Sequence, residues 1–452
     1  MIFAKNALLQ NGWAKNVRLT VDLGLIASVI SNASPVAEDV SVDTLLPALS
    51  NLHSHSFQRA MAGMTEYRAT GRDSFWTWRE LMYRFVNCIT PDQMQAIATL
   101  VFMEMLEAGY AAVGEFHYVH HQKGGTPYDD IAELSNQIYA AAKNTGVGLT
   151  HLPVLYTYGG AGKAPMAESQ LRFGNSVDQY LQLRDRTREG LKHLPPDARL
   201  GMAPHSLRAT SPDDLKATLA QSEVGPVHIH IAEQPKEVAD IKAWLGARPV
   251  EWLFQNADVN SAWCLVHATH MTDDETTRMA KSGAVAGLCP ITESNLGDGP
   301  FNGPEFLKGG GTFGIGSDSN VNISLTEELR SLEYSQRLRD GARNIWVVGE
   351  GSVGEALYKG AAHGGAQALG RNAGVILEGK LADLVAIDSS APALCALTPN
   401  QLIDGLVFAA KDNVVTDVWS AGRHCVTAGQ HIDRDNIIKT YRRAVIQLVA
   451  TL

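Results

Sequence analysis

The chain has 452 residues, 45% of them hydrophobic, and carries a formal net charge of −10. Its length is sufficient for one large domain and a smaller one. The acidic balance and the lack of a lysine or arginine run argue against nucleic acid and membrane surfaces as partners, because neither would attract this chain electrostatically. A small molecule is therefore the expected partner.

The first predicted elements are short strands within residues 1–47. The stretches VRLTVD and LIASVI alternate apolar and polar residues, and Asn11-Gly12 is a turn signal. This segment is expected to be a small all-β piece.

Strand-like and helical patterns alternate over residues 48–373. The strand candidates are 45–53, 110–119, 148–156, 199–206, 226–233, 263–270, 284–290 and 312–319, and the clearest helices between them are 92–109, 129–146 and 211–223. Eight alternations predict a closed (β/α)8 barrel of the TIM type, an α/β fold. An open doubly wound sheet gives a similar pattern, but the first strand is not followed by the GxGxxG that a dinucleotide site would need.

The pattern returns to β structure after about Gly374. The stretches GVILEGKLADLVAID and VVTDVWSAGRHCVTAG carry turn glycines and alternation. Residues 1–47 and 374–452 are therefore expected to form one small β-sandwich domain beside the catalytic barrel of residues 48–373. A long polar segment at 159–175 has the character of a lid over the barrel mouth.

The five cysteines form no CxxC pair, which suits neither a disulfide framework nor a zinc ribbon. The N-terminal segment lacks the apolar stretch of a secretory signal, and no run of about eighteen apolar residues follows it. These features predict a cytoplasmic protein. A homodimer is expected on the frequency of such assemblies alone.

Histidines two residues apart end the first strand candidate of the barrel. Alternation along a strand places His53 and His55 on one face, where two imidazoles can chelate one ion. Two polar residues at a strand end would have the same spacing. His230, His267 and Asp318 fall at the ends of later strand candidates, and such ends converge at the mouth of a barrel. Together they suit Zn²⁺ or Fe²⁺ with one position left for water.

Two carboxylates are placed to move protons near such an ion. A bound divalent ion lowers the pKa of water from near 16 to about 7, and Asp318 could accept the proton released. Glu233, three residues past His230, could carry a proton to a departing amine. Asp318 could instead cap the helix predicted at 324–338, although Ser324 is better placed for that. The remaining histidines of these segments are expected to be structural: His117, His120, His121, His151 and His228.

The order HxH, His230, His267, Asp318, with GKLADLVAID after the barrel, resembles the amidohydrolase superfamily. The resemblance implies a metal-dependent hydrolase with a (β/α)8 barrel and, in its deaminating branch, a single ion. By this resemblance the ligands are His53, His55, His230 and Asp318, and the ion is Zn²⁺ or Fe²⁺. His267 then orients water or polarises substrate without ligating the metal, and acts in catalysis with Glu233 and Asp318.

The segments SNLHSHSFQRAMAGM, EFHYVHH, APHSLRA and CPITESNLGDG are similar to those of the N-formimino-L-glutamate deiminases of histidine degradation. The implied reaction is hydrolysis to N-formyl-L-glutamate and ammonia. A dicarboxylate must meet positive charge, which points to Arg208, with His205 beside it, and to Arg79 in the long loop after the first strand. Gln58 and Tyr118 match family positions that hydrogen-bond substrate.

Two other functions fit parts of the sequence. A deaminase of a purine, pyrimidine or adenosine derivative would use the same ligands, but a planar base needs stacking aromatic residues, whereas paired arginines suit a dicarboxylate. A barrel that serves only as a scaffold would tolerate the loss of ligands. All the expected ligands are present.

Overall fold

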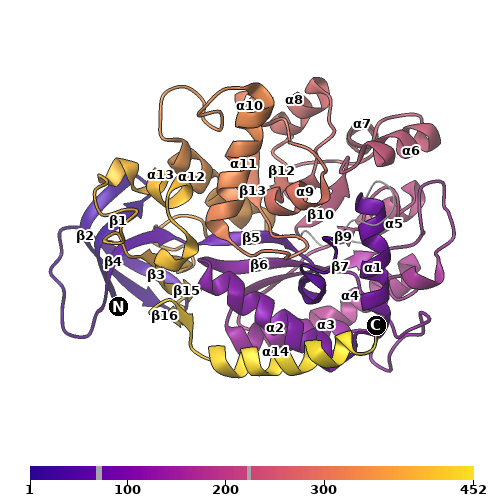
Figure 1. The fold of residues 1–452 in the computed structure, drawn as a ribbon, viewed down its shortest axis with the longest axis horizontal. Helices are drawn as coiled ribbons and strands as arrows, with labels where there is room; N and C mark the ends of the chain where they lie inside the picture. The colour runs from indigo at the N-terminus through magenta and orange to yellow at the C-terminus, as the bar shows by residue number, and fades with distance from the viewer. Residues whose placement is uncertain (68–73, 221–224) are drawn as a thin grey trace.

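The computed structural model describes residues 1–67, 74–220 and 225–452. A large β-sheet lies at one end of the molecule, and parallel strands surrounded by helices make up the rest (Figure 1). Among the described residues, no helix has both the length and the apolar character that crossing a membrane requires. All five cysteines are free thiols.

Both ends of the chain contribute to the sheet at one end of the molecule. Its strand order is β17-β16-β15-β14-β4-β1-β2-β3. The N-terminal strands are β1 (Ile2–Leu9), β2 (Gly12–Asp22), β3 (Leu25–Ile30) and β4 (Val40–Pro47). The C-terminal strands are β14 (Leu384–Ile387), β15 (Val415–Ser420), β16 (Arg423–Thr427) and β17 (Gln430–His431). β4 joins the two sets, because it pairs with β1 in parallel and with β14 in antiparallel register.

Residues 374–452, which were expected to share a small β domain with residues 1–47, do not consist of strands alone. The range also contains α13 (Pro399–Phe408) and α14 (Arg434–Val449). α14 runs beside α2 (Pro91–Glu107) (Figure 1), where Ile437 packs on Leu100 and Met103. The buried residues Ile437, Ala444 and Leu448 recur at helical spacing, a pattern that the turn glycines of the preceding strands obscured.

The central strands form two parallel sheets. One has the order β5-β6-β7-β8, with β9 also on β7, and the other has the order β10-β11-β12-β13. Isolated bridges join the two sheets on both sides: Met202 to Val227 and Ser206 to His230 on one side, and Ser54 to Asp318 on the other. The strands are β5 (Leu49–Ser54), β6 (Tyr110–His117), β7 (Gly148–Leu155), β8 (Arg199–Leu200), β9 (Ala203–Pro204), β10 (Val227–Ile231), β11 (Trp263–His267), β12 (Val285–Leu288) and β13 (Thr312–Ile315).

Each of the eight strand candidates from residues 45–319 overlaps at least one of these strands. The candidate at 45–53 is split at Ala48 between β4 and β5, so the chain passes from the end sheet to the parallel strands at that residue. The candidate at 199–206 contains the two short strands β8 and β9.

Helices follow most of the parallel strands along the chain. They are α1 (Phe75–Cys88), α3 (Glu133–Thr145), α4 (Val177–Leu191), α5 (Pro212–Ala220), α6 (Pro235–Leu245), α7 (Pro249–Asn256), α8 (Asp273–Ser282), α9 (Pro290–Leu296), α10 (Gly303–Lys308), α11 (Leu325–Asp340) and α12 (Val353–Ala368), with short 3₁₀ turns at Ser56–Met61, Glu168–Gln170 and Asp412–Val414. The helices predicted at 92–109 and 129–146 are confirmed as α2 and α3. The one predicted at 211–223 is present as α5, and residues 221–223 lie outside the described residues.

The cap of α11 decides one alternative for Asp318. Ser324 is the N-cap residue, and its side chain accepts a hydrogen bond from the backbone N–H of Glu327 at 3.1 Å. Asp318 is therefore not needed as a cap and is available to the site described below.

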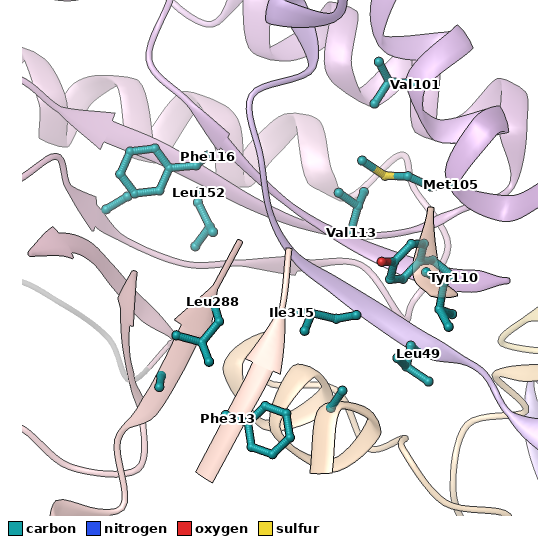
Figure 2. Close-up of a cluster of buried hydrophobic side chains, with 14 of the residues drawn as sticks. Leu49, Val101, Met105, Tyr110, Val113, Phe116, Leu152, Leu288, Phe313 and Ile315 are labelled. Carbon is teal, nitrogen blue, oxygen red and sulfur yellow. The ribbon is translucent and has the colours of Figure 1, made fainter. Parts of the chain in front are cut away.

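Side chains of the parallel strands pack with α2 in the main core (Figure 2). Leu49, Val113, Leu288 and Ile315 are fully buried. Every residue of β6 and β7 is buried, as expected for parallel strands covered on both faces. The carboxyl ends of these strands are thus held by close packing.

Candidate active site

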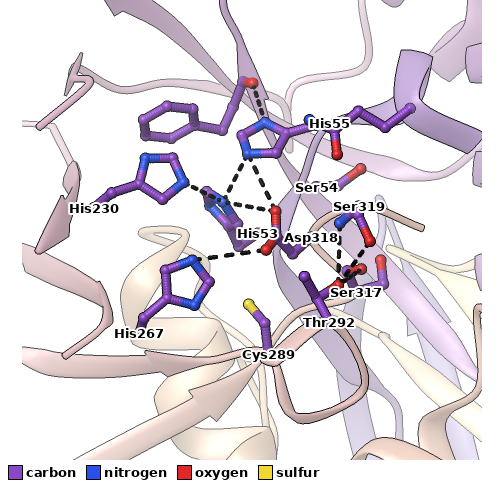
Figure 3. Close-up of polar contacts among 12 residues, drawn as sticks. His53, Ser54, His55, His230, His267, Cys289, Thr292, Ser317, Asp318 and Ser319 are labelled. Carbon is purple, nitrogen blue, oxygen red and sulfur yellow. Dashed lines mark hydrogen bonds and ion pairs between the residues drawn. The ribbon is translucent and has the colours of Figure 1, made fainter. Parts of the chain in front are cut away.

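Three histidines and one aspartate converge at the ends of β5, β10 and β13 (Figure 3). Nε2 of His53 lies 3.2 Å from Nε2 of His55 and 3.0 Å from Nε2 of His230. Oδ1 of Asp318 lies 3.2 Å from Nε2 of His55 and 3.7 Å from Nε2 of His53. One potential ligand atom from each of the four residues lies within 4.8 Å of the others.

The three histidines are neutral, which favours a cation between them. Nδ1 of His55 donates to the carbonyl oxygen of Phe116 at 2.9 Å, and Nδ1 of His230 donates to that of His205 at 3.1 Å. Their Nε2 lone pairs therefore point toward the other ligand atoms. Burial lowers the pKa of His55 to about 3, and burial together with neighbouring histidines holds the pKa of His53 and His230 well below 6.5. Neutral imidazoles with a carboxylate fit a borderline divalent ion such as zinc or iron.

The backbone of Asp318 is held against the end of β5. Its N–H donates to the carbonyl of His53 at 2.9 Å, and its carbonyl accepts from the N–H of His55 at 2.9 Å. Burial raises the pKa of Asp318 to about 7, although the charge of His267 opposes the rise. The carboxyl group is therefore held beside the imidazoles of His53 and His55.

His267 lies beside this cluster and is oriented by a glutamate. Its Nδ1 donates to Oε1 of Glu293 at 3.2 Å, and its Nε2 lies 3.6 Å from Oδ2 of Asp318. Burial alone would lower the pKa of His267, but the hydrogen bond to Glu293 and the surrounding carboxylates raise it to about 10. His267, Cys289 and Asp318 also have potential ligand atoms within 4.8 Å of one another.

Glu233 and Arg208 form an ion pair at the cavity wall. Nη2 of Arg208 donates to Oε2 of Glu233 at 2.8 Å, and both side chains are largely buried. The same guanidinium lies over the ring of Phe75, with 5.7 Å between Cζ and the ring centroid. The structure therefore places the expected proton carrier and the expected carboxylate-binding residue in direct contact.

A cavity of about 240 Å³ opens above the cluster. All five expected substrate-binding residues line it: Gln58, Arg79, Tyr118, His205 and Arg208. Nε2 of Gln58 donates to the hydroxyl of Tyr118 at 2.7 Å. Much of the remaining wall is aromatic, with Phe75, Trp76, Trp78, Tyr83, Tyr156 and Phe173.

Arg79 lies on helix α1, so the prediction that it belongs to a loop is wrong. Its Cζ lies 5.3 Å from the ring centroid of Trp76 and 5.2 Å from that of Tyr83, and its Nη2 donates to the Tyr83 hydroxyl. The side chain of Ser74 caps the helix, and the backbone N–H of Ser74 donates to Oγ1 of Thr77. This threonine form of the capping box lacks the glutamate that usually marks a helix start in sequence.

The other histidines lie away from the cavity wall. Nε2 of His228 donates to the carbonyl of Ala368 at 2.8 Å beneath the cluster. His117, His120, His121 and His151 are buried and do not line the cavity. From the segment 159–175, Gly159, Gly160, Ala161 and Phe173 reach the wall.

Sequence reasoning missed two buried glutamates that hold site residues. Oε1 of Glu115 accepts from the N–H and the hydroxyl of Ser56, at 2.8 and 2.7 Å, and so fixes the residue after His55. Burial raises the pKa of Glu115 to about 7. Glu293 likewise fixes a site residue, because it accepts the hydrogen bond from Nδ1 of His267. A lone glutamate within the apolar strand YAAVGEFH was the available signal for Glu115, whereas Glu293 had none beyond its place after a strand end.

Two protein-family models match this chain. A model of the amidohydrolase family matches residues 44–425. The chain belongs to the amidohydrolase family. A second model, the N-terminal domain of the formimidoylglutamate deiminase HutF, matches residues 1–41 of this amidohydrolase. The resemblance drawn from the motifs is thus confirmed.

Individual proteins similar to this amidohydrolase cover its full length. It is 47% identical over 451 residues to the formimidoylglutamate deiminase of Pseudomonas aeruginosa, with 99% of each chain covered. The crystal structure of an amidohydrolase from Brucella melitensis matches with a TM-score of 0.95 at 47% identity over 99% of each chain. An adenosine deaminase from Xanthomonas campestris with bound zinc matches with a TM-score of 0.82 at 22% identity, over 99% of this chain and 98% of that one, and shares the fold.

Proposed function

We propose that this amidohydrolase hydrolyses N-formimino-L-glutamate to N-formyl-L-glutamate and ammonia, a step of histidine degradation. The observation that carries the proposal is the 47% identity to the P. aeruginosa formimidoylglutamate deiminase over 99% of both chains. The family model for the N-terminal domain of such deiminases supports it. The cavity agrees with a small dicarboxylate, because Arg79 and Arg208 both line it.

His53, His55, His230 and Asp318 would hold one divalent ion. A zinc or iron ion bound by them supplies Lewis-acid chemistry that acidifies a water molecule at neutral pH. Zinc is the preferred assignment, supported by the zinc in the X. campestris adenosine deaminase structure.

The side chains around the ligands have separate roles: some transfer protons and others bind the substrate. Asp318 accepts a proton from the attacking water, and Glu233 delivers one to the departing nitrogen. His267 orients the water or polarises the formimino group. Arg79 and Arg208 hold the two carboxylates, while Gln58, Tyr118 and His205 fix the substrate between them by hydrogen bonds.

The fold proposed for this function is a closed (β/α)8 barrel over residues 48–373 with a small β-sandwich from residues 1–47 and 374–452. The bridges between the two parallel sheets on both sides support closure. Closure brings the ends of β5, β10, β11 and β13 to one mouth. The cytoplasmic location, the homodimer and the lid at 159–175 stay predictions from the sequence.

One observation favours a second function, the deamination of a purine, pyrimidine or adenosine derivative. Aromatic side chains line much of the cavity and offer faces on which a planar base stacks. The arginines weigh against this function, since a neutral base offers no partner for them. The complete ligand set likewise weighs against a scaffold without catalysis.

Ammonia release from the metal-loaded protein decides between these functions. The expected result is turnover of N-formimino-L-glutamate and none of adenosine, guanine or cytosine. Arg79→Met, which keeps an unbranched stem and removes the cation, is expected to raise KM for formiminoglutamate by about 10–100-fold through the loss of a charge-assisted pair. Turnover of a purine without release from formiminoglutamate would overturn the proposal.

A further inference from the structure

The turn between β10 and α6 places Glu233 in an unusual backbone setting. Ala232 has a φ of +50°, in the left-handed region that non-glycine residues seldom adopt. The N–H groups of Ala232 and Glu233 both donate to one side chain, at 3.2 Å to Oε1 and 3.0 Å to Oε2 of Glu237. Glu237 therefore holds the turn from inside, with one carboxylate oxygen on each N–H.

The same carboxylate lies beside Arg208. Oε2 of Glu237 is 3.9 Å from Nε of Arg208, while Nη2 of Arg208 donates to Glu233 at 2.8 Å. The guanidinium thus lies between two carboxylates, only one of which belongs to the cavity wall, because Glu237 is 0% exposed and does not line the cavity. A buried carboxylate is costly unless it is paired and hydrogen-bonded. Among the residues that the structure describes, the hydrogen-bond and ion-pair partners of Glu237 belong to the turn that carries Glu233 or to Arg208.

We propose that Glu237 is a positioning residue for the deamination: it fixes the turn that aims Glu233 at the reacting nitrogen, and it is the permanent counter-charge that orients Arg208 toward a substrate carboxylate. This inference rests on the proposed function. The role of Glu237 as the counter-charge of Arg208 follows from the proton transfer by Glu233. When Glu233 carries a proton it no longer balances Arg208, and Glu237 is the carboxylate that still does.

The substitution Glu237→Gln tests both parts with little change of shape. An amide oxygen can accept from one of the two backbone N–H groups, but the amide nitrogen then faces the other donor, and the charge beside Arg208 is lost. Glu237→Asp separates the two parts, because it keeps the charge but is one methylene too short to reach both N–H groups.

Glu333→Gln is a matched control. Glu333 is also 0% exposed and accepts from two consecutive backbone N–H groups, those of Ile345 and Trp346 at 3.0 and 2.8 Å. It pairs with Arg337 at 2.6 Å and is not part of the cavity wall. It therefore reproduces the stability cost of removing a buried, charged carboxylate without any link to Glu233 or Arg208.

The experiment measures kcat and KM of the full-length, metal-loaded variants with N-formimino-L-glutamate. For Glu237→Gln we expect kcat to fall by about 100-fold, as a misplaced catalytic group would cause, and KM to rise by about tenfold. Glu237→Asp should lose kcat with KM nearly unchanged, and Glu333→Gln should keep both. Metal content should equal that of the wild type in all of them.

Two further measurements separate positioning from loss of structure. Binding of N-formyl-L-glutamate, measured by calorimetry, should weaken by about tenfold in Glu237→Gln and should not weaken in Glu333→Gln. In a double-mutant cycle with Arg208→Gln, the effects on KM should be far from additive. Wild-type kinetics in both Glu237 variants, or additive effects, would overturn the inference. Wild-type protein that releases no ammonia from formiminoglutamate would instead overturn the proposed function.

Discussion

The two histidines of the run VHIHI lie on the same face of β10 but have different partners. His230 turns its Nε2 to the ligand cluster, while Nε2 of His228 donates to the carbonyl of Ala368. The position along the strand decides this, because His228 lies two residues deeper and His230 is one residue from the strand end.

Replacing each histidine in turn distinguishes a proposed metal ligand, His230, from a buried hydrogen-bond donor, His228. His230→Asn keeps a donor near the Nδ1 position and removes Nε2, so the protein is expected to lose most of its metal and its turnover. His228→Gln keeps a donor near the Nε2 position and should retain the metal, with unfolding free energy reduced by about 1–2 kcal/mol. Metal analysis after dialysis, with thermal unfolding, checks both. Full metal content in His230→Asn would remove this residue from the ligand set.

The site residues that could be predicted from the sequence are those recognisable by residue type and by their position at the end of a predicted strand. His53, His55, His230 and Asp318 are of this kind, and the structure brings them together. Glu293 and Glu237 differ, since what matters is which N–H groups their oxygens meet. Those contacts depend on the path of the backbone through turns such as the one at Ala232, and residue type does not encode that path.

At the scale of elements, Gly316, the residue after β13, lies close against β5. A Cβ at this position would lie 2.8 Å from the N, Cβ and O atoms of His53. Real Cβ atoms are not found so near to backbone, so one of the two segments would have to move. The glycine thus allows the segment that carries Asp318 to meet the end of β5, where His53 and His55, two other proposed ligands, lie.

Gly316→Ala is therefore expected to weaken the proposed metal site although it removes no proposed ligand. Displacement of His53 should weaken zinc binding by about 10–100-fold, the range found when groups that support ligands are changed. Titration of the metal-free protein against a competing chelator measures this. Gly351→Ala is the control, because its nearest contact would be an ordinary 3.6 Å to a Val347 methyl group. Equal affinity in both variants would contradict the steric argument.

The elements that the sequence predicted well are the regular ones. The buried strands and helices α2, α3 and α11 follow from apolar runs and periodicity. Helix α1 did not, because its aromatic-rich start FWTW follows a cap without the usual glutamate. That omission is the reason Arg79 was placed in a loop.

At the scale of the whole molecule, a buried ion cluster joins the end sheet to the parallel strands. Arg371, fully buried, donates to both oxygens of Asp383 at 2.9–3.0 Å and to Asp197 at 3.1 Å. Asp197 also accepts from Arg423 at 2.7 Å. Asp197 precedes β8, whereas Asp383 and Arg423 belong to the C-terminal part of the sheet. The cluster therefore fixes one layer on the other by directed, charge-assisted bonds.

Asp197→Asn should loosen this junction and cost about 3 kcal/mol of unfolding free energy, as removal of one member of a buried ion cluster does. Burial tends to raise the pKa of Asp197, but Arg423 and Arg371 outweigh it and the pKa lies below 3.8. The stabilisation is thus complete above about pH 4 and is lost as the pH falls through the lower, folded-state value. Urea unfolding of both proteins at pH 7, 5 and 3.5 should show a constant difference that shrinks only at the lowest pH. A difference that grows with acid would contradict this assignment.

The pairing of β4 with β14 affects how the protein is made. Leu46 lies opposite Val385 in this pair, so most of the polypeptide must be synthesised before β4 meets its partner. At roughly 5–20 residues per second this wait lasts on the order of half a minute. During that time the hydrogen-bonding edge of β4 is open, which is the kind of edge that pairs with other chains. A chain that ends before Leu384 would thus keep an uncovered edge on β4. Such a fragment is expected to bind chaperones.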